Sequence, residues 1–591
     1  MTRFLPDFWK APRLGKCIAN LLSDLESNYS RDLHKWLVIA PVLGVATGLL
    51  ITLLVKIILN WMWPAILKFY LAHPAWIVLG LAVGFLLAGL LMQYLTPHPN
   101  EHSTEEVIRS YHEHQGDIRF RPFIPKLLAA IATVGFGGSA ALEGPSIYGG
   151  GAIGSWIWTR VRKLGFAPRD RRILLISGAA AGMSAVFRAP LTGIVFALEM
   201  PYKDDLAHEA LLPSLIASVT SYATMAAFLG AKPIFDFVSS AVYTRRDLLW
   251  SAALGGLCGL AAMIFGAVFR WVRQFFIAAS LPHFAKMVVG GLLTGICGWT
   301  FLFVFNGQLI PIGPNYEALP QILQQTHSSA YLLSFGATKL AATLCSLGVG
   351  GVSAMFVPLF LTGSSFGVAF AQTVVHSSSV DLFAAVGMAA FLAGGYKTPL
   401  AAVVFVAEAT GGHGYIVPAL IGAAVAYAVS GEGSISGEQR LHESIKVEEL
   451  ANVAVGDVMR TKAVSARAEW TLSEFVNRIG VHHRHSAYPV LEAGRLIGTI
   501  ATAALSKMPP ERWASTLISE ITERGVKRIP LNCDLHEALR LLMNQEAQHM
   551  LLVMSETGEL AGILTKTDVL YAMNPRGPRR AEYVSDSSAA E

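Results

Sequence analysis

The sequence has little charge and little cysteine for its length. Charged residues make up 15% of its 591 residues, apolar residues make up 53%, and the mean hydropathy is +0.47. This balance exceeds what a soluble protein of that length carries and indicates a membrane protein. The five cysteines have no CxxC spacing, so we expect neither a disulfide framework nor a zinc site. We assign the net charge of +5 to basic loops rather than to nucleic-acid binding.

Enzyme motifs are also missing. The sequence contains no HExxH, no GxSxG and no paired aspartates within apolar segments, so nothing supplies a nucleophile or a metal. We therefore expect no enzyme and no required cofactor. Four consecutive residues, HHRH at 482–485, suggest a metal site, but adjacent spacing cannot put three histidines on one face of a strand. A solvated connector is the favoured interpretation.

Long uncharged runs predict membrane spans. Residues 36–55, 75–94 and 287–305 are long enough to cross a bilayer, and 415–429 would need to be extended or tilted. Other apolar pieces are shorter, and 54 glycines and 28 prolines fit broken helices that line an ion pathway. The fold class we expect is an all-α, multi-pass protein of the lipid bilayer.

The first residues lack the features of a signal peptide. Residues 1–32 have no apolar core followed by small residues, but they carry several basic residues. A second basic stretch lies at 160–172, and both favour the cytoplasmic side of a membrane. We expect a cytoplasmic N-terminus in a cell inner or plasma membrane.

One carboxylate stands out in residues 138–155. Glu143 lies among small residues of an apolar region, where an ionisable group is costly and marks a functional site. Pro145 suits the first turn of a helix, so the segment predicts a carboxylate at a helix N-terminus. Such an end attracts anions, and Glu143 is expected to occupy an anion site and yield it to a mobile ion.

Two distant stretches share a pattern. Residues 188–199 and 397–408 each have Pro, then Leu one, Val five, Phe six and Glu nine positions later. Upstream, Glu143 precedes one proline by two residues and Phe356 precedes another in the same way. Coincidence among common apolar residues is the alternative, but the matching offsets favour a duplication whose halves lie inverted around a site near the midplane.

Three motifs carry a resemblance to the CLC family of chloride channels and chloride/proton exchangers. GSAALEGP resembles the GxxxxEGP loop of that family, GGVSAMFVPL resembles its GxFxP loop, and APLTGIVFALE resembles the segment that follows the first loop. The resemblance covers about residues 33–440. It implies a homodimer in which each subunit has its own anion pathway.

The resemblance also implies roles for particular residues. Glu143 resembles the gating glutamate, whose deprotonated carboxylate mimics chloride and whose protonation vacates the site. Backbone N–H groups of Gly144, Met355, Phe356 and Val357 would hold the anion, because several weak dipoles can replace its hydration. Plain core packing is the other interpretation of Phe356.

The loop matching the ion-facing serine of the family departs from the pattern. Our alignment puts His102 there, with Glu101 and Ser103 in place of flanking glycines, and residues 103–106 forming a helix start with acidic residues. His102 could donate an N–H to an anion and make flux sensitive to pH near neutrality. A loop histidine at the cytoplasmic mouth is an equal alternative.

The inner end of the pathway also departs from the family. Ser436 stands where the family has a tyrosine, so either a smaller hydroxyl serves or the inner mouth is wider, unless the loop is displaced by a residue or two. Met200 stands where exchangers carry an inner glutamate for protons, and a thioether cannot carry a proton. Glu199 could substitute, although its repeat partner Glu408 favours a structural role at a helix end.

These departures favour passive or weakly proton-coupled chloride flux. A tightly coupled chloride/proton antiporter is the alternative. A membrane-anchored, nucleotide-sensing scaffold is a third interpretation, but it leaves the costly carboxylate unexplained.

The sequence turns polar after residue 440. Residues 441–510 and 511–574 each contain a short helix, an apolar strand pair and a closing helix, and they resemble paired α+β CBS domains, which often bind ATP, ADP or AMP. Thr565 and Asp568 match the GxxTxxD pattern of the family, and Ala501 and Ala504 have lost both polar groups, so we expect one nucleotide site at most. Asp568 as the N-cap of the last helix is the alternative. Residues 575–591 are expected to be disordered, with the C-terminus in the cytoplasm.

Overall fold

The computed structural model divides the chain into two compact units, Met1–His442 and Glu443–Glu591, which we take in turn. The residues described are 30–100, 103–118, 120–164, 166–232, 234–235, 243–305, 311–323, 327–377, 379–411, 413–441, 453–461, 463–480, 487–505, 508–525, 527–544, 550–555 and 558–573. The histidine run at 482–485, the expected tail at 575–591 and residues 1–29 lie outside this set.

The first unit is helical. Its elements are α2 (Ser30–Val55), η3 (Lys56–Met62), α3 (Trp63–Ala72), α4 (Trp76–Leu95), α5 (Ser103–Glu113), α6 (Phe123–Gly135), α7 (Glu143–Val161), η4 (Arg162–Leu164), α8 (Arg169–Phe187), α9 (Pro190–Glu199), η5 (His208–Ala210), α10 (Leu211–Leu229), α11 (Arg245–Ala278), α12 (His283–Phe305), α13 (Ala318–Leu323), α14 (Ser329–Leu347), α15 (Phe356–Phe370), η6 (Ala371–Val375), α16 (Val380–Tyr396), α17 (Pro399–Thr410), η7 (His413–Tyr415) and α18 (Ile416–Val429).

Seven helices in the described part are long and apolar enough to cross a membrane: His34–Ala72, Trp76–Leu95, His208–Leu229, Arg245–Ala278, His283–Phe305, Ser329–Leu347 and Phe356–Val375. The all-α, multi-pass class is confirmed. Spans expected at 36–55, 75–94 and 287–305 coincide with α2, α4 and α12, and the run at 415–429 forms the shorter α18.

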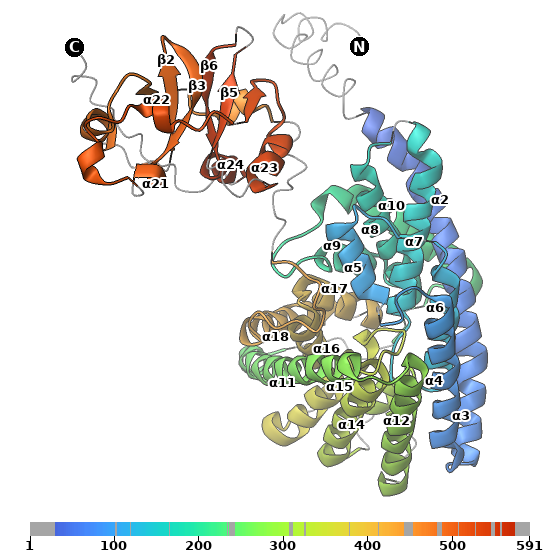
Figure 1. Cartoon of the computed structure of the whole chain (residues 1–591). Coiled ribbons are helices and arrows are strands. Elements are labelled where there is room, and N and C mark those ends of the chain that lie inside the picture. Colours follow the sequence, from blue (N-terminus) through green and yellow to red (C-terminus); the bar gives the residue numbers. More distant parts are fainter. Residues whose placement is uncertain are drawn as a thin grey trace, which may run out of the picture. The chain divides into compact units, whose positions relative to one another are not determined.

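The first span is longer than its uncharged run. Lys56 ends that run, yet the helix continues through the π-helical turn η3 into α3, and Figure 1 shows α2 and α3 as one rod along the side of the unit. The Lys56 ammonium lies 5.4 Å from the centre of the Phe228 ring. This cation–π contact gives the charge a favourable place inside an apolar helix.

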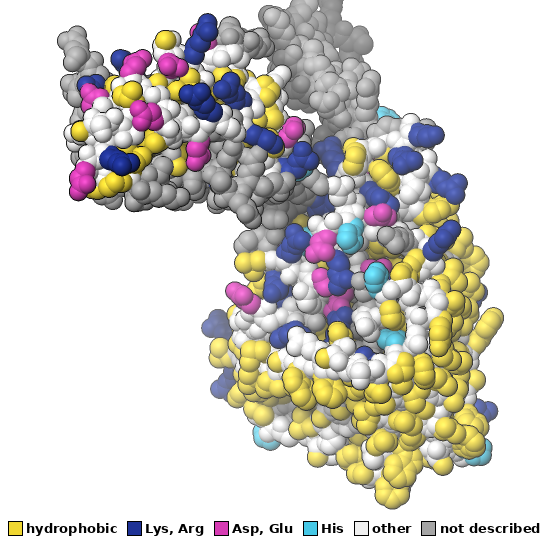
Figure 2. Space-filling view, in the orientation of Figure 1, with side chains coloured by type: hydrophobic (Ala, Val, Ile, Leu, Met, Phe, Trp, Pro, Cys, Tyr) yellow, Lys and Arg dark blue, Asp and Glu magenta, His cyan; other side chains and the backbone are white. Residues whose placement is uncertain are grey.

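Small and buried helices form the centre of the unit. Almost every residue of α8 and α16 is buried, as are the first turns of α7 and α15. Large exposed apolar side chains instead lie on peripheral helices such as α2, α4, α11 and α12. Figure 2 shows hydrophobic side chains covering the lower part of this unit and charged ones gathered above them. The interior is thus enclosed by a surface suited to lipid.

An internal repeat relates α7, α8 and α9 to α15, α16 and α17. Where α7 crosses α8, a Cβ on Gly150 would collide with the carbonyl of Gly178. Where α15 crosses α16, a Cβ on Gly363 would collide with the carbonyl of Gly387. Both crossings need glycine because the helix backbones touch. The paired glycines lie at matching offsets from the repeat motifs, as a duplication requires.

The second unit is α+β. Its elements are α19 (Val455–Val458), β1 (Ala466–Arg467), α20 (Leu472–Phe475), η9 (Val476–Gly480), β2 (Ala487–Glu492), β3 (Arg495–Ala501), α21 (Thr502–Leu505), η10 (Pro510–Arg512), α22 (Ile518–Ile521), β4 (Arg528–Pro530), α23 (Leu535–Asn544), β5 (Met550–Met554), β6 (Leu560–Thr565) and α24 (Lys566–Met573).

Two similar three-stranded sheets organise this unit. In the sheet β1-β2-β3, β1 is parallel and β3 antiparallel to β2, and β4 and β6 flank β5 in the same way. Ala487 on β2 packs with Met550 and Leu552 on β5 in one small apolar cluster. The two halves therefore share a core, as paired domains do.

Candidate functional site

Glu143 is the first residue of α7 and is buried, with 1% of its surface exposed. Its Oε1 accepts the backbone N–H of Phe356, the first residue of α15, at 2.5 Å. A hydrogen bond from the Ala141 N–H to the Ala354 carbonyl, 2.8 Å long, joins the loops just before the two helices. The carboxylate thus lies between two helix N-termini, where backbone N–H groups and helix dipoles favour negative charge.

The second carboxylate oxygen of Glu143 has no hydrogen bond in the described part of the chain. Oε2 is buried and has no hydrogen-bond partner among the residues that the structure describes. A buried carboxylate oxygen without a donor is costly in its ionised form. Oε2 can therefore take up a proton without breaking an existing hydrogen bond.

Phe356 makes separate contacts with its backbone N–H and with its ring. Its N–H holds the carboxylate, and its ring packs among aromatic neighbours, with centroid distances of 5.0 Å to Phe187, 5.6 Å to Phe196 and 4.9 Å to Phe405. This packing fixes the direction in which the N–H points. Gly144 and Val357 are buried beside the same helix starts.

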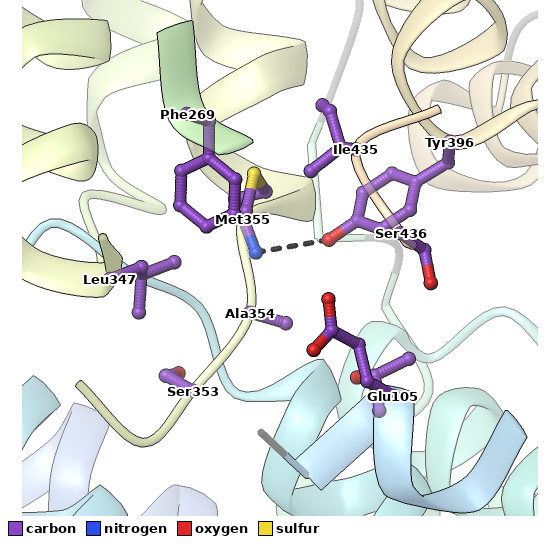
Figure 3. A pocket seen from close by; sticks show the side chains of 10 residues that line it. Glu105, Phe269, Leu347, Ser353, Ala354, Met355, Tyr396, Ile435 and Ser436 are labelled. Carbon is purple, nitrogen blue, oxygen red and sulfur yellow. Dashed lines mark hydrogen bonds between the residues drawn. The ribbon is translucent and has the colours of Figure 1, made fainter. Parts of the chain in front are cut away.

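The N–H of Met355 points the other way, into a pocket. It donates to the hydroxyl of Tyr396 at 3.1 Å. Figure 3 shows this bond at the wall of a pocket that is lined by residues from six segments: Thr104, Glu105, Phe269, Leu347, Ser353, Ala354, Met355, Tyr396, Ile435 and Ser436. Successive N–H groups of one loop therefore serve Glu143 on one side and the pocket on the other.

The expected Ser436 does line this pocket, together with a tyrosine that the sequence did not assign. Ser436 Oγ and Thr104 Oγ1 are buried and have no hydrogen-bond partner in the described part of the chain. With the Tyr396 hydroxyl they provide three hydroxyl donors around one space. Hydroxyl and N–H donors in a mostly apolar pocket can replace the hydration of a small anion.

Tyr396 is the last residue of α16, directly before the second copy of the repeat motif. That position was a signal in the sequence, because the matching end of α8 is Phe187 and the tyrosine adds one hydroxyl to the repeat. Gln439 holds the Ser436 loop against this helix end. Its amide nitrogen donates to the carbonyls of Met200, Tyr202 and Tyr396 at 3.0–3.2 Å.

A second carboxylate, also unassigned by the sequence, lines the pocket. Glu105 on α5 pairs with Arg273 on α11, and Figure 3 shows its carboxylate directed towards Tyr396 and Ser436. The acidic helix start at 103–106 was the available signal, and we interpreted it only as a cap. His102, the expected ion-facing residue, lies outside the described residues.

Glu199 and Glu408 have structural surroundings. Glu199 accepts the N–H groups of Leu400 and Ala401 at the start of α17, at 3.1 and 2.8 Å. Glu408 accepts those of Leu191 and Thr192 at the start of α9, at 2.9 and 2.7 Å. These contacts match the helix-end role favoured for both residues. Met200, 2% exposed, provides no titratable group beside them.

In the second unit, Thr565 and Asp568 bond to each other. The Thr565 N–H donates to the Asp568 carboxylate at 3.0 Å, and the Asp568 N–H donates to the Thr565 hydroxyl at 3.3 Å. The N-cap of α24 is therefore Thr565, and our alternative of Asp568 as N-cap is wrong, because Asp568 completes a capping box from within the helix. Arg460 also donates to Asp568, at 2.8 Å.

Comparison with known families identifies both units. The family model described as voltage gated chloride channel matches residues 83–431, and the CBS domain model matches residues 455–507 and 518–575. A relative named H(+)/Cl(-) exchange transporter ClcA, from Yersinia pestis bv. Antiqua (strain Angola), is 29% identical over 317 residues. That match covers 52% of this chain and 65% of the relative, so the chain spans less than two thirds of that protein. A protein of the same name from Vibrio vulnificus (strain YJ016) is 27% identical, with 56% of this chain and 72% of the relative covered.

Solved structures share the fold. A CLC-type fluoride/proton antiporter is similar with a TM-score of 0.61 and 23% identity, covering 70% of this chain and all of that one. A slow cyanobacterial Cl-/H+ antiporter is similar with a TM-score of 0.59 and 24% identity, and the match covers 67% of this chain and 94% of that one. A eukaryotic CLC transporter is similar with a TM-score of 0.57 and 17% identity, and the match covers 91% of this chain and 98% of that one. Since the chloride channel model matches more than half of the chain, this protein belongs to the voltage-gated chloride channel (CLC) family and carries two CBS domains.

Proposed function

We propose that this protein moves chloride across a membrane in exchange for protons. The observation that carries the proposal is the Glu143 carboxylate bound to the Phe356 N–H between two helix starts. Relatives named H(+)/Cl(-) exchange transporter support exchange more than the passive flux that the sequence favoured. We keep both termini in the cytoplasm and a homodimer with one pathway per subunit as parts of the proposal.

Glu143 acts as a gate that competes with the anion. Ionised, its Oε1 occupies the Phe356 N–H that chloride would use. Protonation at Oε2 removes the charge that the two helix dipoles attract, so the side chain leaves and chloride replaces it. Because chloride can enter the site only when Glu143 has bound a proton, the movements of the two ions are coupled.

The pocket beyond Met355 is the next anion position. Chloride there accepts the hydroxyls of Tyr396, Ser436 and Thr104, in place of its water shell. Several neutral donors bind a passing ion without the tight hold of a fixed ammonium. Gly144 and Val357 contribute backbone at the gate itself.

Passive chloride flux is a second candidate, favoured by one observation. Met200 occupies the position of the inner proton glutamate of the family, and its thioether cannot accept a proton. Measurement of both ions on the purified protein in liposomes separates the candidates. Under exchange, a chloride gradient drives protons uphill; a chloride current without proton movement supports the passive candidate.

The CBS pair is proposed as a regulatory unit that takes one adenine nucleotide. Thr565 and Asp568 provide a hydroxyl and a carboxylate for ribose oxygens. Arg460 and the capping contacts engage the same carboxylate in this structure, so nucleotide binding has to displace or share them. Ligand binding would thereby change the start of α24.

A further inference from the structure

Exchange requires a group that accepts protons on the inner side of the gate. Met200 cannot serve, and the Glu199 carboxylate is taken up by the N–H groups of α17. Glu105 is a carboxylate that lines the pocket below the gate. Its side chain is 11% exposed, so it is enclosed without being sealed from solution.

The surroundings of Glu105 come from three elements. Arg273 on α11 forms an ion pair with it, and Tyr396 on α16 faces it across the pocket, as Figure 3 shows. Arg270, also on α11, donates to the Ser434 carbonyl and so holds the loop that brings Ser436 to the same pocket.

Tyr396 connects this carboxylate to the gate. Its hydroxyl accepts the Met355 N–H, and the adjacent Phe356 N–H binds Glu143. These two bonds use neighbouring backbone N–H groups, and the pocket separates the Tyr396 hydroxyl from Glu105.

We propose that Glu105 is the inner proton-transfer residue of this protein, and that Tyr396, with water that enters the pocket, passes its proton to Glu143. The inference rests on the proposed exchange. A proton from the inner solution binds the Glu105 carboxylate, then moves to the Tyr396 oxygen as that hydroxyl releases its own proton towards Glu143. Tyr396 is neutral before and after, Glu105 returns to its ionised form, and Glu143 ends protonated.

The same arrangement couples the two ions at the pocket. Chloride held by the Tyr396, Ser436 and Thr104 hydroxyls adds negative charge beside Glu105, which pairs with Arg273. Like charges disfavour ionisation, so an anion in the pocket favours protonation of Glu105. Proton loading therefore accompanies anion binding even without a glutamate at position 200.

The test measures chloride and proton flux of the full-length protein in liposomes. For Glu105→Gln we expect proton flux to fall by about a hundredfold, the scale of a lost general acid–base group, and the ratio of protons to chloride to fall with it. Glu113→Gln is the matched control, because Glu113 lies on the same helix and pairs with Arg440 at 3.7 Å, outside the pocket. The control should leave both fluxes unchanged.

The Asp and Gln variants of Glu105 separate proton transfer from a structural role. Glu105→Asp keeps a titratable carboxylate and should retain proton flux and its dependence on inner pH; equal losses in the Asp and Gln variants would mean a structural role and overturn the proposal. Normal proton flux in Glu105→Gln would overturn it as well. If the unmodified protein moves chloride but no protons, the exchange function itself fails, which is a different result from failure of Glu105 alone.

Discussion

Glu199 and Glu408 cap each other's helices across the internal repeat. Glu199 at the end of α9 accepts the first N–H groups of α17, and Glu408 near the end of α17 accepts the first N–H groups of α9. The two antiparallel partners are thus tied at both ends by carboxylates. This reciprocal contact joins the two halves beside the site without using the gate.

Removal of one cap should weaken the fold and leave exchange intact. We expect Glu408→Ala to lower the free energy of unfolding by about 1 kcal/mol, the usual cost of a lost helix cap. Thermal unfolding followed by size-exclusion chromatography measures the loss.

The partner residue tests the proton path. In Glu199→Gln the ratio of proton flux to chloride flux in liposomes should be unchanged. A fall in that ratio would mean that Glu199 carries protons after all.

The gate variant should separate the two ions. Glu143→Gln mimics the protonated gate, so chloride flux should persist or rise while proton flux disappears, because the amide cannot carry a proton. Chloride efflux and pH changes in liposomes measure both. Glu209→Gln, an exposed carboxylate on η5, is the control. Unchanged chloride and proton flux in Glu143→Gln would count heavily against the gate assignment.

Loss of the pocket tyrosine hydroxyl should weaken anion binding. Tyr396→Phe leaves the Met355 N–H without its 3.1 Å partner and removes one donor to the anion. An unsatisfied buried group costs about 1–3 kcal/mol, so we expect chloride affinity by calorimetry to drop roughly 5- to 150-fold.

Tyr427, which lies outside this pocket, provides the control for Tyr396→Phe. Tyr427→Phe removes a hydroxyl that donates to the Lys203 carbonyl at 2.8 Å, and chloride affinity should stay the same. Equal affinities in the two variants would exclude the Tyr396 hydroxyl from the anion site.

The glycine crossings of the repeat should not tolerate a methyl group. Gly150→Ala and Gly363→Ala force a Cβ against a backbone carbonyl, so we expect each to destabilise the protein by about 1–3 kcal/mol, as overpacked cores do. Gly256→Ala on α11 is the control, because a Cβ there meets only a Val425 methyl at 3.9 Å. Melting curves of the three variants measure the difference, and equal stability would contradict the close approach.

The nucleotide proposal depends on one carboxylate. Asp568→Ala should abolish adenine nucleotide binding by calorimetry, since it removes the group offered to the ribose. Arg460→Ala frees the same carboxylate from its 2.8 Å ion pair and should keep or tighten binding. Retained binding in Asp568→Ala would show that the GxxTxxD match has only its capping role.

Parts of the site could be predicted because their signals are local. Glu143, Pro145 and the flanking glycines mark a helix start within a few residues, and α7 does begin at Glu143. The helix-end roles of Glu199 and Glu408 followed from equal offsets in the two repeats. Those offsets persist because both copies pack in the same way, with glycine at each crossing.

The pocket could not be predicted in the same way. The sequence shows that Tyr396 adds a hydroxyl to one copy of the repeat and that Glu105 lies in a first helical turn, but it does not show that the two face the same space. The sequence led us to look for a hydroxyl near Ser436 alone, and we did not consider that α16 would bring another to the same space.

The sequence by itself determined that this is a duplicated membrane protein with a carboxylate at a helix start, because hydropathy, repeat offsets and cap residues act over short stretches of chain. Only the tertiary structure decided that Oε1 of Glu143 meets the N–H of Phe356, and that Tyr396, Ser436 and Glu105 share one pocket. These contacts join residues that are far apart in the sequence, so they depend on how closely the helix backbones pack. That packing is set by the whole fold.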